Sequence, residues 1–377
     1  MTNNLHNRRI IFVITSLDFG GAQKQAFVLA KKLRDKYKAE ISFAGFGKTS
    51  DEFTDILDKE NISWKQIEIP WTYSRIYLFL NFIAELRKLR PDFIFSYCYT
   101  ANIVSSLFWK FTGARSCIWN QRDEGLAKYF INFGKLPAKL ASHFISNSEG
   151  GKSYLIKKFS VRESKINVIH NGIELKSVGN KDNFRKQNNI PANTLVACMI
   201  ANLSVHKDHV NLLASWAIVV KKLNEQNINA LLLLAGAFGG TEKKIQELIE
   251  ELNIRSNVKL LGFVKDTSEL LGMSDMAVFS SRSEGSPNGL LECMAAGLPI
   301  IGTNIAGIKS CVSEENYPYL FLSEDYNSFG NGILELFADP ELRNKIGKKN
   351  FEKIQKDFSI EKMTLETASI LDRINLL

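Results

Sequence analysis

The sequence predicts an α/β protein with two domains, each built on a parallel sheet. Short apolar or β-branched runs alternate with amphipathic segments of helix length through almost the whole chain. This is the pattern of parallel strands joined by crossover helices. The rhythm restarts near residue 194, and 377 residues with 45% hydrophobic content suit two to three globular domains.

The first domain is expected to span residues 1–176 as a doubly wound fold. The longest apolar runs of the chain, Ile10–Leu17 and Ala230–Ala237, are well short of the roughly 20 residues that a membrane-spanning helix needs, so we expect no transmembrane span. Its expected strands are Arg9–Ser16, Glu40–Phe46, Asp92–Tyr97, Ser116–Trp119, His143–Ser146 and Asn167–His170.

A polar stretch at 177–193, poor in β-branched residues, predicts a linker. The second domain is expected at 194–358, with the ligand site in a cleft between the domains. Residues 359–377 predict a C-terminal helix with Ser359 as N-cap. Whether this helix packs back on the first domain or ends the second stays open. The strands expected in the second domain are Leu195–Ala201, Ala230–Ala235, Val258–Leu261, Met276–Ser280, Pro299–Thr303 and Tyr319–Phe321.

The formal charge of +8 favours anionic partners such as nucleotide phosphates, pyrophosphate lipids or a membrane surface. We expect no nucleic-acid partner, because the basic residues are spread out and no recognition motif accompanies them. The five cysteines are scattered and form no C-x-x-C pair, which fits a reducing cytoplasm. No D-x-D pair is present to hold a divalent metal, so we expect neither a metal nor another cofactor.

The most informative stretch, Met276–Thr303, predicts a strand, a polar loop, a short helix and another strand. Ser286 suits an N-cap and Pro287 the first helical position. Gly297 followed by Pro299 marks the end of the helix.

The start of this helix is expected to bind a diphosphate. Backbone N–H groups at a helix N-terminus lack intrahelical partners and carry a partial positive charge, so a diphosphate at Ser286–Leu290 could collect main-chain hydrogen bonds. Asn288 and Gly289 allow it to approach closely. Glu284 and Glu292 flank the helix start and can accept hydrogen bonds from paired sugar hydroxyls. Spacing alone is equally compatible with a helix cap and a solvated glutamate.

The run SEGSPNGLLECMAAGLPIIGT resembles the Glu-x7-Glu signature of the retaining glycosyltransferases of family 4. The resemblance implies the GT-B fold, two Rossmann-like domains facing across a cleft. It also implies that Glu292 binds the ribose hydroxyls of the nucleotide and that Glu284 lies against the donor sugar. Retention of configuration is likewise an implication of the family.

Three further segments are similar to donor-binding elements of this family. Leu17–Leu33 resembles its glycine-rich turn, with Gly20 and Gly21 opening a helix toward the donor phosphates. Ala201–His209 resembles the segment that supplies an arginine and a lysine to the pyrophosphate. Lys207 matches the lysine, and Asn202 stands where arginine is frequent.

The third segment is LLLLAGAFGG, followed by Asn257–Ser281, and it resembles the elements on the nucleobase side. Gly236 is expected to end a strand near the ligand. The backbone around Phe263 and Val264 could face the base. An ordinary turn is the alternative in each case.

Two residues of the first domain are candidates for the acceptor side. Tyr97 occupies a position where relatives carry histidine, and we expect it to position a ligand; a core tyrosine is the alternative. Arg122 could meet an acceptor phosphate or the donor, or pair with Asp123 or Glu124. The segment Trp71–Arg90 predicts a crossover helix, with peripheral contact to a membrane surface as the less favoured reading.

These observations predict a glycosyltransferase, either hexosyl- or N-acetylhexosaminyl-transferring, in surface polysaccharide biosynthesis. It would take a nucleotide sugar as donor and a saccharide or polyprenyl-pyrophosphate-linked saccharide as acceptor. It would act in the cytoplasm or at the inner face of the cell membrane. Glu284 and Lys207 are the expected catalytic residues, because charge develops on the departing nucleoside diphosphate. The alternatives are a sugar-nucleotide epimerase of the same architecture and a non-catalytic nucleotide- or carbohydrate-binding partner.

Overall fold

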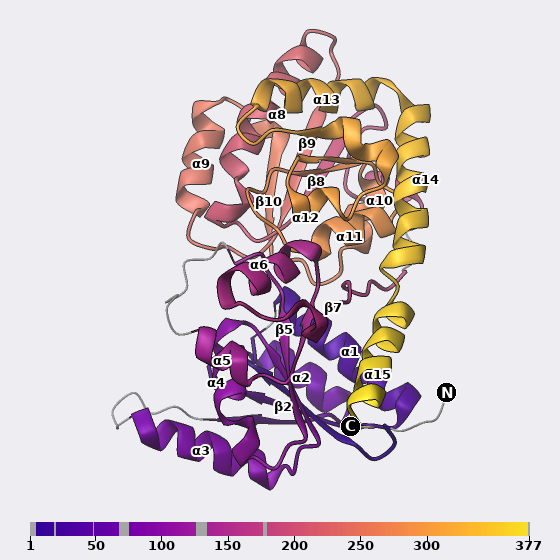
Figure 1. Ribbon diagram of the computed structural model, residues 1–377. Coiled ribbons are helices and arrows are strands. Elements are labelled where there is room, and N and C mark those ends of the chain that lie inside the picture. The colour runs from indigo at the N-terminus through magenta and orange to yellow at the C-terminus, as the bar shows by residue number, and fades with distance from the viewer. Residues whose placement is uncertain are drawn as a thin grey trace. The chain divides into compact units, whose positions relative to one another are not determined.

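The computed structural model describes residues 5–18, 20–47, 49–67, 75–125, 134–175 and 179–375. The chain forms two compact units (Figure 1). Unit 1 comprises Met1–Gly172 and Ile360–Leu377, and unit 2 comprises Ile173–Ser359. Both units are parallel sheets covered by helices, which confirms the predicted α/β class.

Unit 1 contains a seven-stranded sheet in the order β3-β2-β1-β4-β5-β6-β7. Every strand predicted for this unit is present, with ends that differ by a few residues. Strand β3 was not predicted, because it is a short edge strand, SWKQ, without an apolar run. The strands are β1 (Arg9–Ile14), β2 (Glu40–Gly45), β3 (Ser63–Gln66), β4 (Phe93–Tyr97), β5 (Ser116–Gln121), β6 (His143–Ser146) and β7 (Ile166–Val168).

The helices of unit 1 lie between these strands in the chain, with one addition from the C-terminus. Helix α15 (Ile360–Asn375) belongs to unit 1, where it packs against α1 and buries Leu371 in the same core as Phe12. The other helices are α1 (Gly21–Tyr37), α2 (Asp51–Lys59), α3 (Arg75–Lys88), α4 (Tyr99–Phe108), α5 (Lys135–Leu140) and α6 (Glu149–Phe159). The described part of the unit also contains two short 3-10 turns, η1 (Trp109–Phe111) and η3 (Glu163–Lys165).

Helix α3 lies within the segment where a crossover helix and a membrane contact were both considered. Phe82 and Leu86 of α3 are buried in the core beneath the sheet, as expected for a crossover helix. Residues 71–74 of that segment lie outside the described residues. Among the described residues, no helix is long and apolar enough to cross a membrane.

Unit 2 contains a six-stranded sheet in the order β10-β9-β8-β11-β12-β13. All six strands predicted for it are present. They are β8 (Leu195–Ile200), β9 (Ala230–Ala235), β10 (Val258–Gly262), β11 (Met276–Phe279), β12 (Ile300–Thr303) and β13 (Leu320–Phe321). The longer helices are α8 (His209–Asn224), α9 (Glu242–Glu251), α11 (Asn288–Ala295), α13 (Tyr326–Ala338) and α14 (Pro340–Asp357). The shorter elements are α10 (Ser268–Met273), α12 (Ala306–Lys309), η4 (Val205–Lys207), η5 (Arg255–Asn257) and η6 (Glu314–Tyr319).

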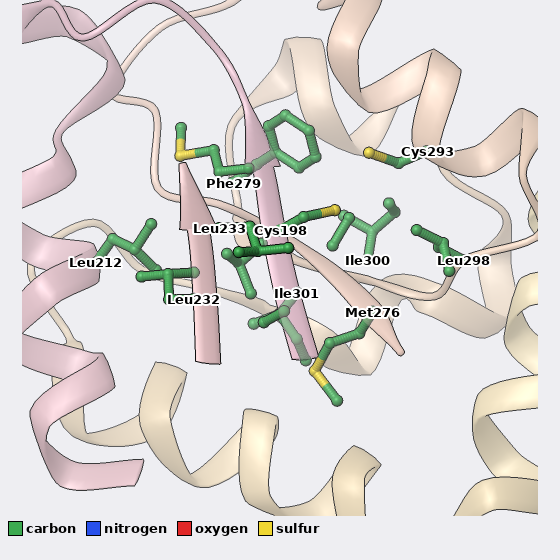
Figure 2. Close-up of a cluster of buried hydrophobic side chains, with 14 of the residues drawn as sticks. Cys198, Leu212, Leu232, Leu233, Met276, Phe279, Cys293, Leu298, Ile300 and Ile301 are labelled. Carbon is green, nitrogen blue, oxygen red and sulfur yellow. The ribbon is translucent and has the colours of Figure 1, made fainter. Parts of the chain in front are cut away.

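The core of unit 2 lies between the sheet and these helices. Figure 2 shows apolar side chains of β8, β9, β11 and β12 together with Cys293 of α11 and Leu212 of α8. The short helix α11 is therefore anchored to the sheet through its buried face.

Within the segment predicted as a linker, 177–193, the described residues 179–193 are instead a folded part of unit 2. Helix α7 (Lys181–Gln187) forms within it, and its buried Arg185 pairs with the buried Asp275 at 2.6 Å. The same carboxylate accepts the Val196 N–H of β8 at 2.7 Å. Composition suggested a linker because α7 is polar, but its charges are satisfied by partners far away in the sequence.

Candidate active site

The candidate site lies at the carboxyl edge of the unit 2 sheet, where β8 and β11 are neighbours. From β8 the chain winds outward through β9 to β10, and from β11 it winds the other way through β12 to β13. In open α/β sheets, ligands bind outside the carboxyl ends of the strands at such a reversal of strand order. The loops that follow β8 and β11 are therefore the parts of unit 2 where a ligand is expected to bind.

Helix α11 follows β11 and begins at Asn288, one residue later than predicted. Pro287 occupies the N-cap position. Its ring fixes φ, which is −73°, and its ψ of 116° is extended, as at other N-caps. Ser286 is thus not the N-cap. Its buried hydroxyl lies 3.8 Å from the Cys311 sulfur. The helix ends as predicted before Gly297, which has φ +74°.

Close packing places the start of α11 against the end of β8. A Cβ added at Gly289 would lie 2.0 Å from the Ile200 carbonyl oxygen, so only glycine allows this approach. The N-terminal end of α11, with its partial positive charge, therefore sits beside the loop that follows β8.

Lys207 and Glu284 meet across the point where the strand order reverses. Lys207 ends η4 after β8, Glu284 lies in the loop after β11, and the ammonium and carboxylate form a hydrogen-bonded ion pair. The Ser281 hydroxyl donates to the same carboxylate oxygen at 2.7 Å. The side chain of Glu284 is only 9% exposed, whereas that of Lys207 is 23% exposed and can still reach a ligand.

Residues that the sequence analysis missed fasten the two loops together. The Ser280 hydroxyl donates to the Lys207 carbonyl at 2.9 Å, and the Arg282 N–H donates to the His206 carbonyl at 2.9 Å. The Arg282 guanidinium pairs with the buried Asp208 at 2.7 Å. The run of polar residues at the end of β11, SSRSE, was the available signal, since buried polar side chains need hydrogen-bond partners.

Glu292 is tied to a different loop. The Thr267 hydroxyl, from the segment after β10, donates to its Oε2 at 3.1 Å. Glu284 is held from the β8 side and Glu292 from the β10 side. The two carboxylates thus lie toward different loops around the start of α11.

Asn202 and Gly236 lie at the ends of β8 and β9. The Asn202 side-chain oxygen accepts the Ala237 N–H at 3.2 Å, so this residue pins the loop after β9. A Cβ at Gly236 would lie 2.0 Å from the Ala201 carbonyl oxygen, which explains glycine at this close crossing. An arginine at 202 would supply a cation but could not accept that hydrogen bond.

The remaining predicted residues lie at the carboxyl edge of the unit 1 sheet, near the reversal between β1 and β4. Gly20 caps α1 in an extended conformation with φ −151°, and α1 begins at Gly21. Neither glycine needs a left-handed backbone. A Cβ at Gly20 would meet only the flexible Gln23 side chain, at 2.7 Å.

Tyr97 is a core residue. It is 2% exposed, its ring centroid lies 6.0 Å from that of Phe12, and burial raises its pKa to about 12. The Arg122 guanidinium lies over its ring, 5.3 Å from the centroid, and also donates to the side-chain oxygen of Asn171 at 2.5 Å. Tyr97 therefore supports Arg122 from beneath.

Among the described residues, no group of three or more His, Cys, Asp or Glu side chains could hold a metal ion. That the reaction needs no metal stays a prediction.

Comparison with known proteins decides the family. Residues 19–177 match the family described as Glycosyltransferase Family 4, and residues 180–353 match Glycosyl transferases group 1. The chain belongs to glycosyltransferase family 4. As a member of that family it is a glycosyltransferase, as the Glu-x7-Glu run predicted.

Relatives extend over most of the chain. An uncharacterized glycosyltransferase of Methanocaldococcus jannaschii is 25% identical over 84% of this chain and 89% of its own length. A Campylobacter jejuni N-acetylgalactosaminyltransferase, named for an N-acetylgalactosamine-N,N'-diacetylbacillosaminyl-diphospho-undecaprenol acceptor, is 23% identical over 91% of this chain and 95% of its own.

Solved structures share the fold. HepE of Anabaena, determined with UDP and glucose, has a TM-score of 0.84 at 19% identity, covering 97% of this chain and 100% of its own. A sucrose-phosphate synthase of Thermosynechococcus elongatus has a TM-score of 0.79 at 18% identity, covering 98% and 99%. The predicted GT-B fold is thereby confirmed.

Proposed function

We propose that this glycosyltransferase moves a hexosyl or N-acetylhexosaminyl group from a uridine-diphosphate sugar to a lipid-linked saccharide, with retention and without a metal, in the assembly of a surface polysaccharide. The observation that carries the proposal is the Lys207–Glu284 pair beside the N-terminal end of α11. Family relatives supply the substrate classes. One is named for an undecaprenol-diphosphate acceptor, another for UDP-galactose, and a third for capsular polysaccharide biosynthesis.

Lys207 would neutralise charge on the departing diphosphate. Breaking the anomeric bond concentrates negative charge on the nucleoside diphosphate, and a fixed ammonium beside a helix N-terminus stabilises that charge more than it stabilises the bound donor. Lys207 would exchange its contact with Glu284 for one with a phosphate oxygen. The carboxylate released in this way would accept hydrogen bonds from sugar hydroxyls.

Glu292 would hold the ribose. A carboxylate can accept two hydrogen bonds from neighbouring hydroxyls, and the hydrogen bond from Thr267 already fixes its orientation. The phosphates would then lie at the start of α11 between the ribose and the transferred sugar.

The test uses the full-length chain with UDP-, GDP-, ADP- and dTDP-linked sugars, first in thermal-shift binding and then with a polyprenyl-diphosphate saccharide. We expect stabilisation by UDP-linked sugars, a product heavier by one sugar, and an α-linked product by NMR from an α-linked donor. Glu292→Ala should abolish transfer, while Glu341→Ala on the exposed face of α14 should not. Epimer formation without acceptor would replace the transferase by the epimerase alternative. Full glycan synthesis by Glu292→Ala would indicate a non-catalytic partner.

A lipid-linked acceptor requires contact with a membrane, and unit 1 carries a suitable surface. The Trp109 indole N–H donates to the Leu140 carbonyl at 2.9 Å, which places η1 beside α5. Phe111 and Leu136 of these elements are 63% and 57% exposed. Exposed lysines accompany them at Lys110, Lys135 and Lys139.

We propose that this surface binds anionic lipid. Sedimentation with vesicles that contain phosphatidylglycerol should carry the protein down at low salt, and neutral vesicles should not. Lys135→Glu combined with Lys139→Glu should abolish sedimentation. Equal binding to neutral vesicles, or unchanged binding of the double variant, would overturn this assignment without affecting the transferase proposal.

A further inference from the structure

The loop after β9 presents an aromatic side chain to solvent. Phe238 lies in the sequence Gly-Ala-Phe-Gly-Gly at 236–240, and its side chain is 54% exposed. An exposed phenylalanine loses the free energy that burial of its ring would give, so its presence on a loop of small residues is unfavourable unless the ring contacts a ligand. The position of the loop in the sheet indicates which ligand this is.

Hydrogen bonds on both sides hold this loop in place. The Leu203 N–H donates to the Ala237 carbonyl at 2.9 Å, and the Gly239 N–H donates to the Leu203 carbonyl at 3.0 Å. Asn202 accepts the Ala237 N–H at 3.2 Å. Phe238 is therefore fixed between two bonded neighbours and stays at the carboxyl edge of the sheet.

The ring lies next to the end of β10. The Gly236 N–H donates to the Gly262 carbonyl at 2.8 Å, and a Cβ built on Gly262 would be 3.9 Å from Cε2 of Phe238. Phe263, the residue after Gly262, is itself 46% exposed. Two aromatic side chains thus occur at the carboxyl ends of adjacent parallel strands.

This aromatic pair lies on the β9–β10 side of the proposed donor site. Asn202, which accepts a hydrogen bond from the Phe238 loop, lies in the same loop after β8 as Lys207, the residue proposed to bind the phosphates. Thr267, which holds Glu292 for the ribose, follows β10. A nucleotide with its phosphates near Lys207 and its ribose near Glu292 therefore has its base directed to the side where Phe238 lies.

We propose that the ring of Phe238 forms one wall of the nucleobase subsite and that the base of the donor stacks on it. The inference rests on the proposed function. Stacking suits this position because every base offers a π face to an aromatic ring, while a loop of glycine and alanine has no other side chain for the purpose. Phe238 would then contribute to affinity for nucleoside diphosphates in general, leaving the choice among bases to other contacts.

The test compares Phe238→Ala, Phe238→Leu and Phe238→Tyr by isothermal titration with UDP, GDP and inorganic pyrophosphate. Phe238→Ala should weaken UDP and GDP binding roughly 5- to 100-fold, the range expected for one base–aromatic stack, and should leave pyrophosphate binding unchanged. Phe238→Leu should lose most of the affinity, and Phe238→Tyr should restore it. In kinetics, KM for the donor should rise while kcat changes little. Tyr326→Ala, which removes an exposed aromatic side chain at the start of α13 in the same unit, is the matched control and should bind UDP as the parent does.

Each of the other outcomes contradicts either the stacking assignment or the proposed function. Unchanged UDP and GDP affinity in Phe238→Ala overturns the stacking assignment and leaves the transferase proposal intact. An equal loss of pyrophosphate affinity, or a lower melting temperature without ligand, indicates a structural role of the loop and also overturns it. If the parent protein binds no nucleoside diphosphate at millimolar concentration, the proposed function itself fails.

Discussion

At the scale of single residues, the charged groups of the site are paired with one another. Without a donor, Glu284 holds the ammonium of Lys207 and the hydroxyl of Ser281, so neither charge is left alone in a partly buried place. An unpaired charge there would be costly to keep. Donor binding consequently has to exchange one ion pair for another.

Lys207→Met should lower kcat/KM by about 100- to 1000-fold, because one fixed electrostatic contact to the developing charge is lost. The Ser281 hydroxyl still donates to Glu284 in this variant, and thermal unfolding checks that the variant is folded at the assay temperature. Steady-state kinetics with a UDP-sugar measures the loss. Lys243→Met, at a 91% exposed position of α9, is the control and should be fully active. A loss of less than tenfold would remove Lys207 from the catalytic machinery.

His209, the first residue of α8, makes the stability of unit 2 depend on pH. It is 3% exposed, and neither ring nitrogen has a hydrogen-bond partner among the described residues. Burial, helped by the charge of Lys207, lowers its pKa to about 4. Between that value and its ordinary value the unfolded chain binds more protons than the folded one. Stability is therefore complete above pH 6.5 and falls as the pH drops toward 4, by at most about 3 kcal/mol.

His209→Leu should remove this dependence. The difference in the free energy of unfolding between pH 7.5 and pH 4.5 should shrink by about 1 to 3 kcal/mol relative to the parent, measured by denaturant unfolding of unit 2. His6→Asn, at an exposed position, should leave the difference as it is. Parallel pH curves for the parent and His209→Leu would show that this imidazole does not titrate as described.

At the scale of elements, the contact between α11 and β8 determines where the phosphates can be bound. Gly289 allows the helix start to touch the Ile200 carbonyl, and Gly307 of α12 would place a Cβ 1.9 Å from the Glu284 carbonyl oxygen. Backbone packed this closely cannot yield without moving a whole element. These two glycines thus lie at positions where backbone elements pack closely together around the site.

Gly289→Ala should displace α11 and cost about 1 to 3 kcal/mol of stability, as overpacking does. Because the helix start moves, UDP affinity should fall as well. Thermal unfolding and titration calorimetry measure the two effects. Gly330→Ala on α13 is the comparison, since its Cβ would lie 3.0 Å from the Ser215 carbonyl oxygen and needs only a small shift. Parent-like UDP binding by Gly289→Ala would contradict the proposed role of this contact.

At the scale of the whole molecule, unit 1 is built from two separate segments of the chain. Helix α15 contributes Leu371, Ile370 and Ala368 to the core of unit 1, against α1. Helix α15 is therefore part of the core of unit 1, although the whole of unit 2, Ile173–Ser359, separates it from the rest of that unit in the sequence.

Leu371→Ala should destabilise unit 1 by about 2 to 5 kcal/mol, because it leaves a cavity in the core, while the UDP affinity of unit 2 should be kept. Leu365→Ala on the same helix, at a 39% exposed position, should change stability by less than about 0.5 kcal/mol. Thermal unfolding followed by calorimetry separates the two. A fully stable Leu371→Ala variant would contradict the packing of α15 described above.

Local sequence patterns were sufficient to predict most of the strands and the short helix of the site. Twelve of the observed strands were predicted because each is an apolar run bounded by polar or glycine residues, and such runs carry their signal within a few residues. The short helix that starts between Glu284 and Glu292 was also predicted from local signals, the proline at its start and the glycine after its end, with an error of one residue at its start. Strand β3 was not predicted because this short, half-buried edge strand contains no apolar run.

By itself, the sequence determined the fold class, the position of nearly every strand and the presence of a helix start flanked by Glu284 and Glu292. Only the tertiary structure decided that Lys207 pairs with Glu284, 77 residues away, that Tyr97 is buried beneath Arg122, and that α7 and α15 belong to units 2 and 1. The physical reason is that strand order, which no local pattern encodes, selects the loops that meet at the edge of a sheet.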